Sequence, residues 1–509
     1  MIHYPEPKKL VAPSVEKTII AATVVFTLAA GGIITVLYSQ FRVPSVIFIT
    51  LTACFIIPTI ALVFLGYRDT FDPWSLTCYM GLMVFVVSPL LHLFYRDPGL
   101  PTLPYHFEPL LRVVAWSSVP IIPLLYLGHR VALRNFQPLL KPYHRANPAK
   151  LLPIGLVLAV VGTISFIVYY VYMQEVIITG TGGRLITLTA GTVLILADGA
   201  ILGVLLIVYA LMLRNLGLAK KLRIFDTVLI VIVCALVIVA NLYRGGRGKM
   251  LGMFAWVACL YNQFVRRISL VMIIVAWIVL MPMLTVYKVS KVSGFADLGE
   301  LITNPEYRAS QTERYGASST HTLIANLGRS YIWMLYLQEL KPGGNIDRQW
   351  GKTYVSAPLQ IIPRWLYPTK PRGITDVTVD ARYGRGAGKM GYRAAMVAGI
   401  WAEGYANFGF LGVWAAAFVY GLIIGYAKRF FATREPSNIF HFMFFIIAAS
   451  LGPYLLIGDL RLVIWGVFRV SILLVPLLWW ASDPAEPELE DLVYDEYHQD
   501  EYYEDGDYS

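Results

Sequence analysis

Cationic and flat aromatic side chains alternate in a proline-rich part of the chain, where together they could bind a sugar phosphate. The cations are Arg364, Lys370 and Arg372, and the aromatic side chains are Trp365 and Tyr367. A guanidinium offers a planar fork to phosphate oxygens, and an aromatic face offers an apolar surface on which a pyranose ring can pack. Prolines make the segment stiff because they fix φ and remove N–H donors. An interfacial aromatic belt with cations that reach the headgroups is the alternative interpretation.

Two glycine-rich runs carry further positive charge. Glycine lets backbone N–H groups approach an anion closely, so each run is a candidate phosphate-binding segment. The candidate residues are Arg244, Arg247 and Lys249 in the first run, and Arg382, Arg385 and Lys389 in the second.

Glu403 and Asn407 stand four residues apart, so a helix places them on one face. They occur where the chain enters an apolar stretch, and a carboxylate there is costly unless it is paired or functional. Glu403 is therefore a candidate general base for an acceptor hydroxyl, or a group that orients a cation. A structural ion pair with an arginine of the preceding segment is the alternative.

The elements that must position these residues are membrane helices. The chain has 509 residues, 57% of them hydrophobic and 15% charged, whereas a soluble domain has about 25% charged residues. This composition excludes a soluble enzyme, a disordered chain and a nucleic-acid binder. The sequence predicts an all-α polytopic membrane protein with about twelve apolar stretches long enough to cross the hydrocarbon. These stretches are 18–38, 44–66, 74–95, 111–129, 151–173, 190–213, 226–243, 250–265, 268–287, 397–427, 440–458 and 462–481.

Short cytoplasmic loops retain Lys and Arg, and this rule places both termini in the cytoplasm. Two segments on the opposite face oppose the rule: the turn at 244–249 and the long segment between Tyr287 and Met396. The long segment holds fifteen Lys and Arg against eight Asp and Glu. Positive charge outside the cytoplasm indicates a polyanionic ligand there. For the long segment, the alternative is that long translocated loops ignore the rule.

The predicted organisation has four parts. An N-terminal transmembrane bundle of about nine helices covers 1–287, a large extracytoplasmic loop with short helices covers 288–396, and C-terminal transmembrane helices cover 397–481. Within the loop, 320–340 has a helical apolar pattern and is expected to lie along the membrane surface or to enter it in part. The tail 482–509 holds twelve of the 32 acidic residues and five tyrosines, a composition typical of disorder.

No cofactor is expected. The four cysteines lie far apart within predicted spans and show neither metal-ligand spacing nor a disulfide framework. The outer segments contain no Asp-x-Asp motif and no His/Cys cluster, so no metal site is predicted.

The order of these elements resembles the Wzy-type family of O-antigen and oligosaccharide repeat-unit polymerases. Three features carry the resemblance, which is sharp only over 244–250 and 350–412. They are the turn Gly246-Arg247-Gly248, the outer segment with Ile362-Pro363-Arg364 and Pro368-Thr369-Lys370-Pro371, and Glu403 followed by Asn407-Phe408-Gly409.

The resemblance implies a GT-C-like glycosyltransferase of the bacterial plasma membrane that needs no metal. Its substrates would be polyprenyl-pyrophosphate-linked oligosaccharides at the outer face, polymerised into an O-antigen or exopolysaccharide. The expected partners are a chain-length-regulating co-polymerase and membrane lipid, and no nucleic acid.

The departing pyrophosphate gains charge, so the chemistry calls for cations at that point. Arg247 and Arg364 are the catalytic candidates for this role, with Glu403 as the base. Substrate-binding candidates are Arg244, Lys249, Lys370, Arg372, Trp365, Tyr367, Arg382, Arg385, Lys389 and Asn407.

Two other functions remain open. An O-antigen ligase would take glycan from the same carrier to a lipid core, and such enzymes depend on an outer histidine, for which His106 and His321 are available. A transporter or flippase for the same lipid-linked sugars would show internal repeats or broken helices with a site near the bilayer midplane. No clear repeat is visible in the sequence.

Overall fold

The computed structural model describes most of the chain, and its regular structure is almost entirely helical. The described residues are 13–37, 43–97, 103–104, 106–135, 144–179, 186–216, 226, 228–232, 234, 255–262, 267–276, 298–314, 330–362, 366–367, 369–387, 399–432 and 458–484.

Eight described stretches are long and apolar enough to cross a membrane. They coincide with eight of the twelve predicted spans, which confirms a helical, multi-pass membrane protein. The other four predicted spans, 226–243, 250–265, 268–287 and 440–458, are described only in part. The eight are Ser14–Val36, Pro44–Phe64, Pro73–Tyr95, Glu108–Arg134, Pro148–Val168, Leu196–Arg214, Gly399–Lys428 and Leu460–Trp480.

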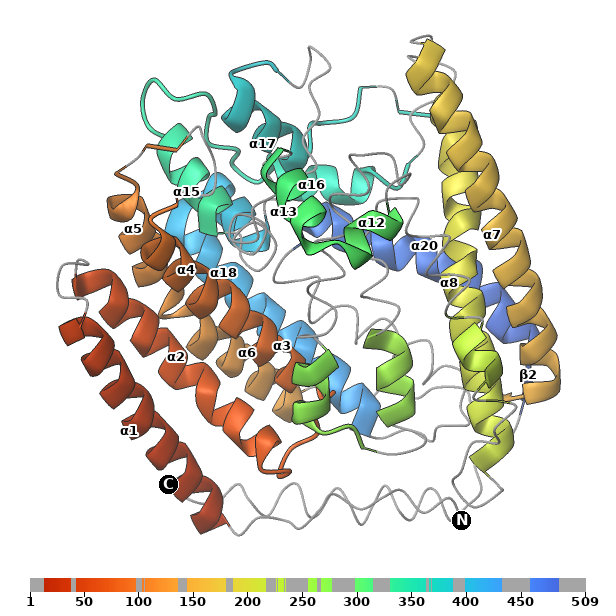
Figure 1. Cartoon of the computed structure of the whole chain (residues 1–509), viewed down its shortest axis with the longest axis horizontal. Helices are drawn as coiled ribbons and strands as arrows, with labels where there is room; N and C mark the ends of the chain where they lie inside the picture. The colour runs from red at the N-terminus through yellow and green to blue at the C-terminus, as the bar shows by residue number, and fades with distance from the viewer. Residues whose placement is uncertain are drawn as a thin grey trace. The chain divides into compact units, whose positions relative to one another are not determined.

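The chain forms two compact units. Unit 1 comprises Met1–Arg134, Asn241–Tyr426 and Ala448–Arg469, and unit 2 comprises Asn135–Ala240, Ala427–Ile447 and Val470–Ser509. Within unit 1, the first two helices, α1 (Pro13–Leu37) and α2 (Val43–Phe64), pack side by side (Figure 1). The candidate site residues that the structure describes all belong to unit 1.

The third span is interrupted by one turn of π-helix. It consists of α3 (Pro73–Leu82), the π segment Met83–Val87 and α4 (Ser88–Tyr95). Pro89 stands two residues after the π turn. Proline lacks the N–H for the regular helical bond and its ring crowds the carbonyl four residues earlier, which a wider turn accommodates. The turn carries Phe85, one of the largest fully buried side chains.

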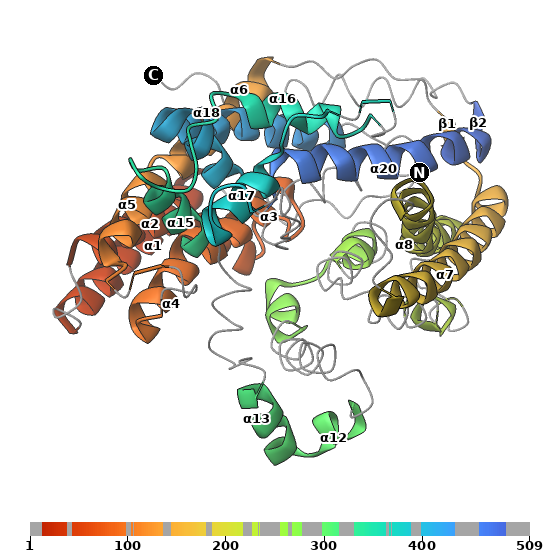
Figure 2. The same ribbon diagram turned by 90° about the horizontal axis from the view of Figure 1, so that it is seen from above.

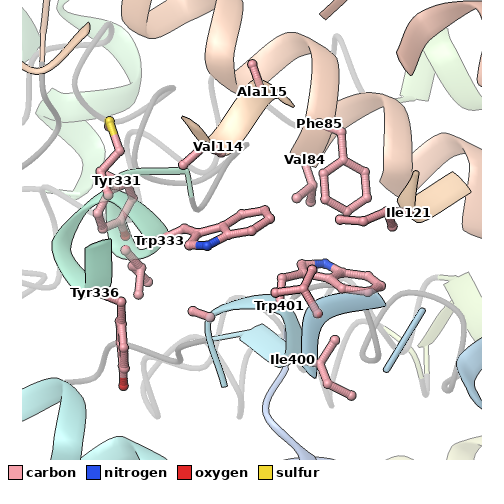
Figure 3. Packing of buried hydrophobic residues seen from close by; sticks show 14 of the residues in the cluster. Val84, Phe85, Val114, Ala115, Ile121, Tyr331, Trp333, Tyr336, Ile400 and Trp401 are labelled. Atoms are coloured by element: carbon pink, nitrogen blue, oxygen red, sulfur yellow. The ribbon is translucent and has the colours of Figure 1, made fainter. Parts of the chain in front are cut away.

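A short helix from the predicted outer loop lies inside the core of unit 1. Helix α15 (Ser330–Glu339) buries nearly every side chain and packs against α5 (Glu108–Ser118) and α17 (Ile374–Tyr383). Figure 3 shows its Trp333 in the same interior region as Trp401 and Phe85. The helix expected within 320–340 is therefore present from Ser330. It is not a surface helix, because it buries apolar side chains on all its faces.

Helices α5 and α6 (Ile121–Asn135) together form the fourth span. The other described elements of the outer segment are α12 (Leu298–Thr303), α13 (Pro305–Arg314) and α16 (Lys352–Leu359). The last two long helices are α18 (Gly399–Ala432) and α20 (Leu460–Trp480).

Unit 2 is built on a close helix pair, α7 (Pro148–Thr179) and α8 (Ile186–Leu216), which lie side by side in both views (Figures 1 and 2). A Cβ atom added at Gly162 would come within 2.1 Å of the Ala200 backbone nitrogen, and one at Gly203 within 2.4 Å of the Ala159 nitrogen. Small residues at such a contact let membrane helices approach backbone to backbone, where van der Waals packing is strongest.

This contact predicts a difference between two glycines of one helix. Gly203→Ala should lower the free energy of unfolding of unit 2 by about 1–3 kcal/mol through overpacking, because its methyl group would meet backbone. Gly199→Ala is the matched control, since the nearest atom to its Cβ is the flexible Leu158 Cδ2 at 3.6 Å. Thermal unfolding in detergent measures both variants, and equal midpoints would contradict the described packing.

A two-stranded sheet fixes the end of the last helix in unit 2. Strand β1 (His144–Ala146) pairs antiparallel with β2 (Ser482–Pro484), with Arg145 opposite Asp483. Lys150 Nζ lies 2.7 Å from Asp483 Oδ1, and this hydrogen bond lowers the pKa of the Asp483 carboxyl. The first three residues of the predicted disordered tail therefore form a strand, and 485–509 lie outside the described residues.

Candidate functional site

The candidate site is built around a break in α18. Phe408 (φ −133°, ψ 16°) and Gly409 (φ 68°, ψ −150°) leave the helical conformation. A Cβ atom at Gly412 would come within 2.3 Å of the Gly404 carbonyl oxygen, although eight residues of a straight helix span about 12 Å. The short helix 399–407 therefore folds back against the beginning of 410–432.

One end of this short helix lies at the same depth as the middle of two membrane-spanning helices. The ring of Trp401 lies 5.4 Å from that of Phe85 and 5.9 Å from that of Tyr420, measured between centroids. Phe85 stands near the middle of the third span, and Tyr420 near the middle of 410–432. The stretch 410–432 is about 34 Å long as a helix, enough to cross the hydrocarbon alone. The break therefore lies at one end of a span.

Glu403 and Asn407 lie on one face of the short helix, as predicted, and both contact Thr353 at the start of α16. The Thr353 hydroxyl donates to Glu403 Oε1 at 2.9 Å, and the Asn407 side-chain amide donates to Thr353 Oγ1 at 2.7 Å. The second carboxylate oxygen, Glu403 Oε2, accepts the backbone N–H of Leu460 at 2.9 Å. Glu403 and Asn407 have no exposed surface.

The contacts that the structure describes for Glu403 are thus a hydroxyl and a backbone amide. Neither is a cation, so the expected ion pair with an outer arginine does not appear among the described residues. Two satisfied oxygens without exposed surface make Glu403 a group that joins α16, α18 and α20.

The turn before α16 is fastened to the end of the short helix. Asn407 Oδ1 accepts the Gly351 N–H at 2.8 Å, and the Ala406 carbonyl accepts the Gln349 N–H at 2.9 Å. Arg348 Nη1 donates to the Tyr405 carbonyl at 2.5 Å and its guanidinium stacks over the Tyr405 ring. These bonds satisfy carbonyls that the helix break leaves without intrahelical partners.

The start of α20 is held by a second buried carboxylate, Asp459. Its Oδ1 accepts the Leu462 N–H at 2.8 Å, an N-terminal cap of the helix. Its Oδ2 accepts the Thr375 hydroxyl of α17 at 3.2 Å. Glu403 therefore connects the first residue of α20 to α16, and Asp459, directly before α20, connects to α17.

The contacts of Glu403 and Asp459 with Thr353, Thr375 and Leu460 form a junction between the outer segment and α20. The predicted cations Lys370 and Arg372 stand next to this junction. Arg372 forms a two-pronged ion pair with Asp380, with N–O distances of 2.7 and 3.1 Å, and this hydrogen bonding raises the pKa of the guanidinium. Lys370 Nζ donates to the Gln360 carbonyl at 3.2 Å, where α16 ends. Arg372 is held in one orientation, and its side chain is still 39% exposed.

The second glycine-rich run lies at the end of α17. Gly384 and Gly386 have positive φ values of 102° and 85°. Between them, Arg385 forms an exposed ion pair with Asp347 at 2.8 Å, while Arg382 stacks over the Tyr383 ring. An anion site in this run stays a prediction.

Of the remaining predicted site residues, one is described by the structure and six are not. Tyr367 is described and partly exposed. The others lie outside the described residues: Arg244, Arg247, Lys249, Arg364, Trp365 and Lys389.

Three residues of the junction were not among the predicted site residues, although Asp459 and Arg461 stand out in the sequence as ionisable groups just before the last span. Thr353 is one of many threonines, and its partners come from fifty residues away. Asp459 carries the signal of an N-cap, an aspartate directly before an apolar run. Arg461 stands beside Gly373: its Nη1 lies 3.3 Å from the position of a Cβ atom at that glycine.

Within the described residues, no three His, Cys, Asp or Glu side chains gather in a way that would hold a metal ion. Comparison with protein-family models, with curated proteins and with solved structures finds no match to this chain.

Proposed function

We propose that the chain polymerises polyprenyl-pyrophosphate-linked oligosaccharide repeat units at the outer face of the bacterial plasma membrane. The acceptor hydroxyl oxygen attacks the anomeric carbon of the donor sugar, and its proton passes to an accessible carboxylate or to water. The bond from that carbon to the pyrophosphate oxygen breaks, and the polyprenyl pyrophosphate leaves with the electron pair. Side-chain cations stabilise the leaving group in place of a metal, and a co-polymerase sets the chain length.

One observation carries the proposal. Within 350–412, where the resemblance to the polymerases is sharp, two distant parts of the chain are joined directly: Gly351 and Thr353 contact Glu403 and Asn407. The junction places Arg372 and Lys370 on a fixed support. Fixed cations cost little reorganisation when charge develops on the leaving group. Arg247 and Arg364 also belong to the proposal, and the support for them is the sequence pattern alone.

Glu403 has a positioning role in this proposal. A general base must reach the proton that it removes, within about 3 Å or through one water, and Glu403 has no exposed surface. Its two hydrogen bonds instead hold α16 and the start of α20 together. Asp376, which is half-buried beside Arg372 and caps Gly373 N–H at 3.2 Å, is the more accessible carboxylate.

A broken helix is also expected of a second candidate, a transporter of the same lipid-linked sugars. Transporters place broken half-helices and their site near the bilayer midplane. The break at Phe408 and Gly409 lies instead at one end of a stretch that crosses the membrane alone, which supports chemistry near the membrane surface. The ligase alternative rests on His106, which is exposed, and on His321, which lies outside the described residues.

Substitution of Arg372 tests the role of the fixed cation. Arg372→Ala should lower the rate of polymer formation by about 10²-fold if the guanidinium stabilises the leaving group. Arg372→Lys should recover part of the rate, because it keeps the charge and loses the two-pronged geometry.

Arg68→Ala is the matched control for Arg372. Arg68 pairs with Glu16 at 3.0 Å outside the site, with 34% of its side chain exposed. Polymer length and protein level in cells provide the readout. Equal polymer from the Arg372→Ala and Arg68→Ala chains at equal protein levels would remove Arg372 from the mechanism.

A further inference from the structure

Trp350 is displayed at the surface by an unusual backbone turn. Its φ is 49°, a left-handed value that is uncommon for a bulky residue, and its side chain is 71% exposed. Gly351 follows with φ 82°. Asn407 and Ala406 hold the turn by hydrogen bonds to the residues on either side of Trp350. The same residues that organise the candidate site therefore force this indole outward.

The helix that follows Trp350 adds a second exposed apolar side chain. Helix α16 buries Thr353, Ser356 and Ala357 and turns Val355 outward with 63% exposure. Leu366, beyond the end of α16, is 59% exposed. A helix of eight residues does not cross a bilayer, so this apolar face contacts either bulk acyl chains or a bound apolar ligand. It needs an apolar partner that reaches the outer segment.

Cations lie at the far end of α16. Lys370 contacts the Gln360 carbonyl there, and Gly373 lies between Ser356 of α16 and the Arg461 guanidinium. Arg372, which is paired with Asp380, lies in the same part of the chain, and Asp376 caps Gly373. Among the residues that the structure describes, the Arg461 guanidinium has no carboxylate partner. Lys370 and Arg461 therefore supply positive charge at one end of an apolar surface.

We infer that this surface binds the carrier lipid itself, a polyprenyl pyrophosphate. The isoprenoid chain lies against Trp350, Val355 and Leu366, and the pyrophosphate lies at Lys370 and Arg461. This inference rests on the proposed function and adds the place of the lipid and the role of Arg461. An ordinary phospholipid has an apolar chain and a phosphate too, but its single phosphodiester carries less charge than a pyrophosphate.

Photocrosslinking tests this assignment without any need for catalysis. The full-length chain carries p-benzoylphenylalanine at Val355 or, as the matched control, at Val419 of α18, which is 48% exposed on a span. Each protein is placed in nanodiscs of phosphatidylethanolamine and phosphatidylglycerol with a small fraction of undecaprenyl pyrophosphate. Mass spectrometry of the adducts gives the enrichment of the polyprenyl lipid over its mole fraction.

At position 355 we expect enrichment of at least about fivefold, equivalent to roughly 1 kcal/mol, and none at 419. Lys370→Ala with Arg461→Ala should remove that enrichment. Equal adducts at both positions, dominated by phospholipid, would mean that α16 contacts bulk lipid only and would overturn the inference. If the chain makes polymer but shows no enrichment at position 355, the lipid-binding surface is refuted and the polymerase proposal stands. If position 355 is enriched but the chain makes no polymer, the lipid-binding surface stands and the polymerase proposal is refuted.

Discussion

Glu403→Ala should abolish polymer formation and lower the stability of the protein, whereas Glu403→Gln should keep activity within about threefold of the unchanged chain. Alanine leaves the Thr353 hydroxyl and the Leu460 amide without their buried acceptor. Each unsatisfied buried group costs about 1–3 kcal/mol. The junction between α16 and α20 should therefore open.

Glutamine can preserve both contacts. Its amide oxygen accepts the Leu460 N–H, and its amide nitrogen donates to the second lone pair of Thr353 Oγ1, beside the one that Asn407 uses. The bond to Thr353 is reversed, and the hydroxyl proton loses its acceptor, so a lower stability with the junction still closed is expected. A positioning role consequently survives this substitution. A general base does not, because an amide cannot take up the proton, and loss of a general base costs about 10²–10⁴-fold in rate.

The measurement is the initial rate of polymer formation together with the thermal unfolding midpoint in detergent. A Glu403→Gln chain that unfolds normally but loses rate by 10²-fold or more would assign Glu403 to proton transfer and refute the positioning role. Thr353→Val is the companion variant: it removes the hydroxyl that both Glu403 and Asn407 contact, and it should resemble Glu403→Ala in stability.

Gly412→Ala should disrupt the fold-back of α18 and with it the site. The added Cβ would lie 2.3 Å from the Gly404 carbonyl oxygen and 3.0 Å from Phe408 Cβ. Two backbones meet here, so no side chain can turn away to relieve the overlap. Overpacking of this kind costs about 1–3 kcal/mol and occasionally more. The short helix carries Glu403 and Asn407, so polymer formation should fall with stability.

Gly466→Ala in α20 is the control for this substitution, because no atom lies within 4 Å of the added Cβ. In a helix interior it should be neutral or stabilising by up to about 1 kcal/mol. Thermal unfolding of the two purified variants gives the comparison. If Gly412→Ala unfolds at the temperature of Gly466→Ala, the close contact between Gly404 and Gly412 is refuted.

The sequence predicts those features that depend on local composition. Apolar length alone marks the eight described spans, because crossing hydrocarbon needs about 20 apolar residues. The four-residue spacing of Glu403 and Asn407 places them on one face, and their contacts agree.

Features that depend on distant partners are not visible in one sequence. The burial of α15 was not predicted, because an apolar ten-residue helix has the same composition on a membrane surface and in a core. The neutral partners of Glu403 were not predicted either: arginines are numerous in the outer segment, but Thr353 and the Leu460 amide occupy the carboxylate. The fold-back at Gly409 follows from two glycines eight residues apart, and glycines are too frequent in membrane helices to mark it.

Reconstitution tests the proposed polymerase most directly. The purified full-length chain is placed in liposomes with a polyprenyl-pyrophosphate-linked repeat unit that it uses in cells, and without other proteins. The proposal predicts a ladder of lipid-linked polymers that grows by one repeat unit per step, with release of one polyprenyl pyrophosphate for each unit added. Repeat units that only cross the bilayer, or that remain monomeric while glycan passes to an added lipid core, would contradict it.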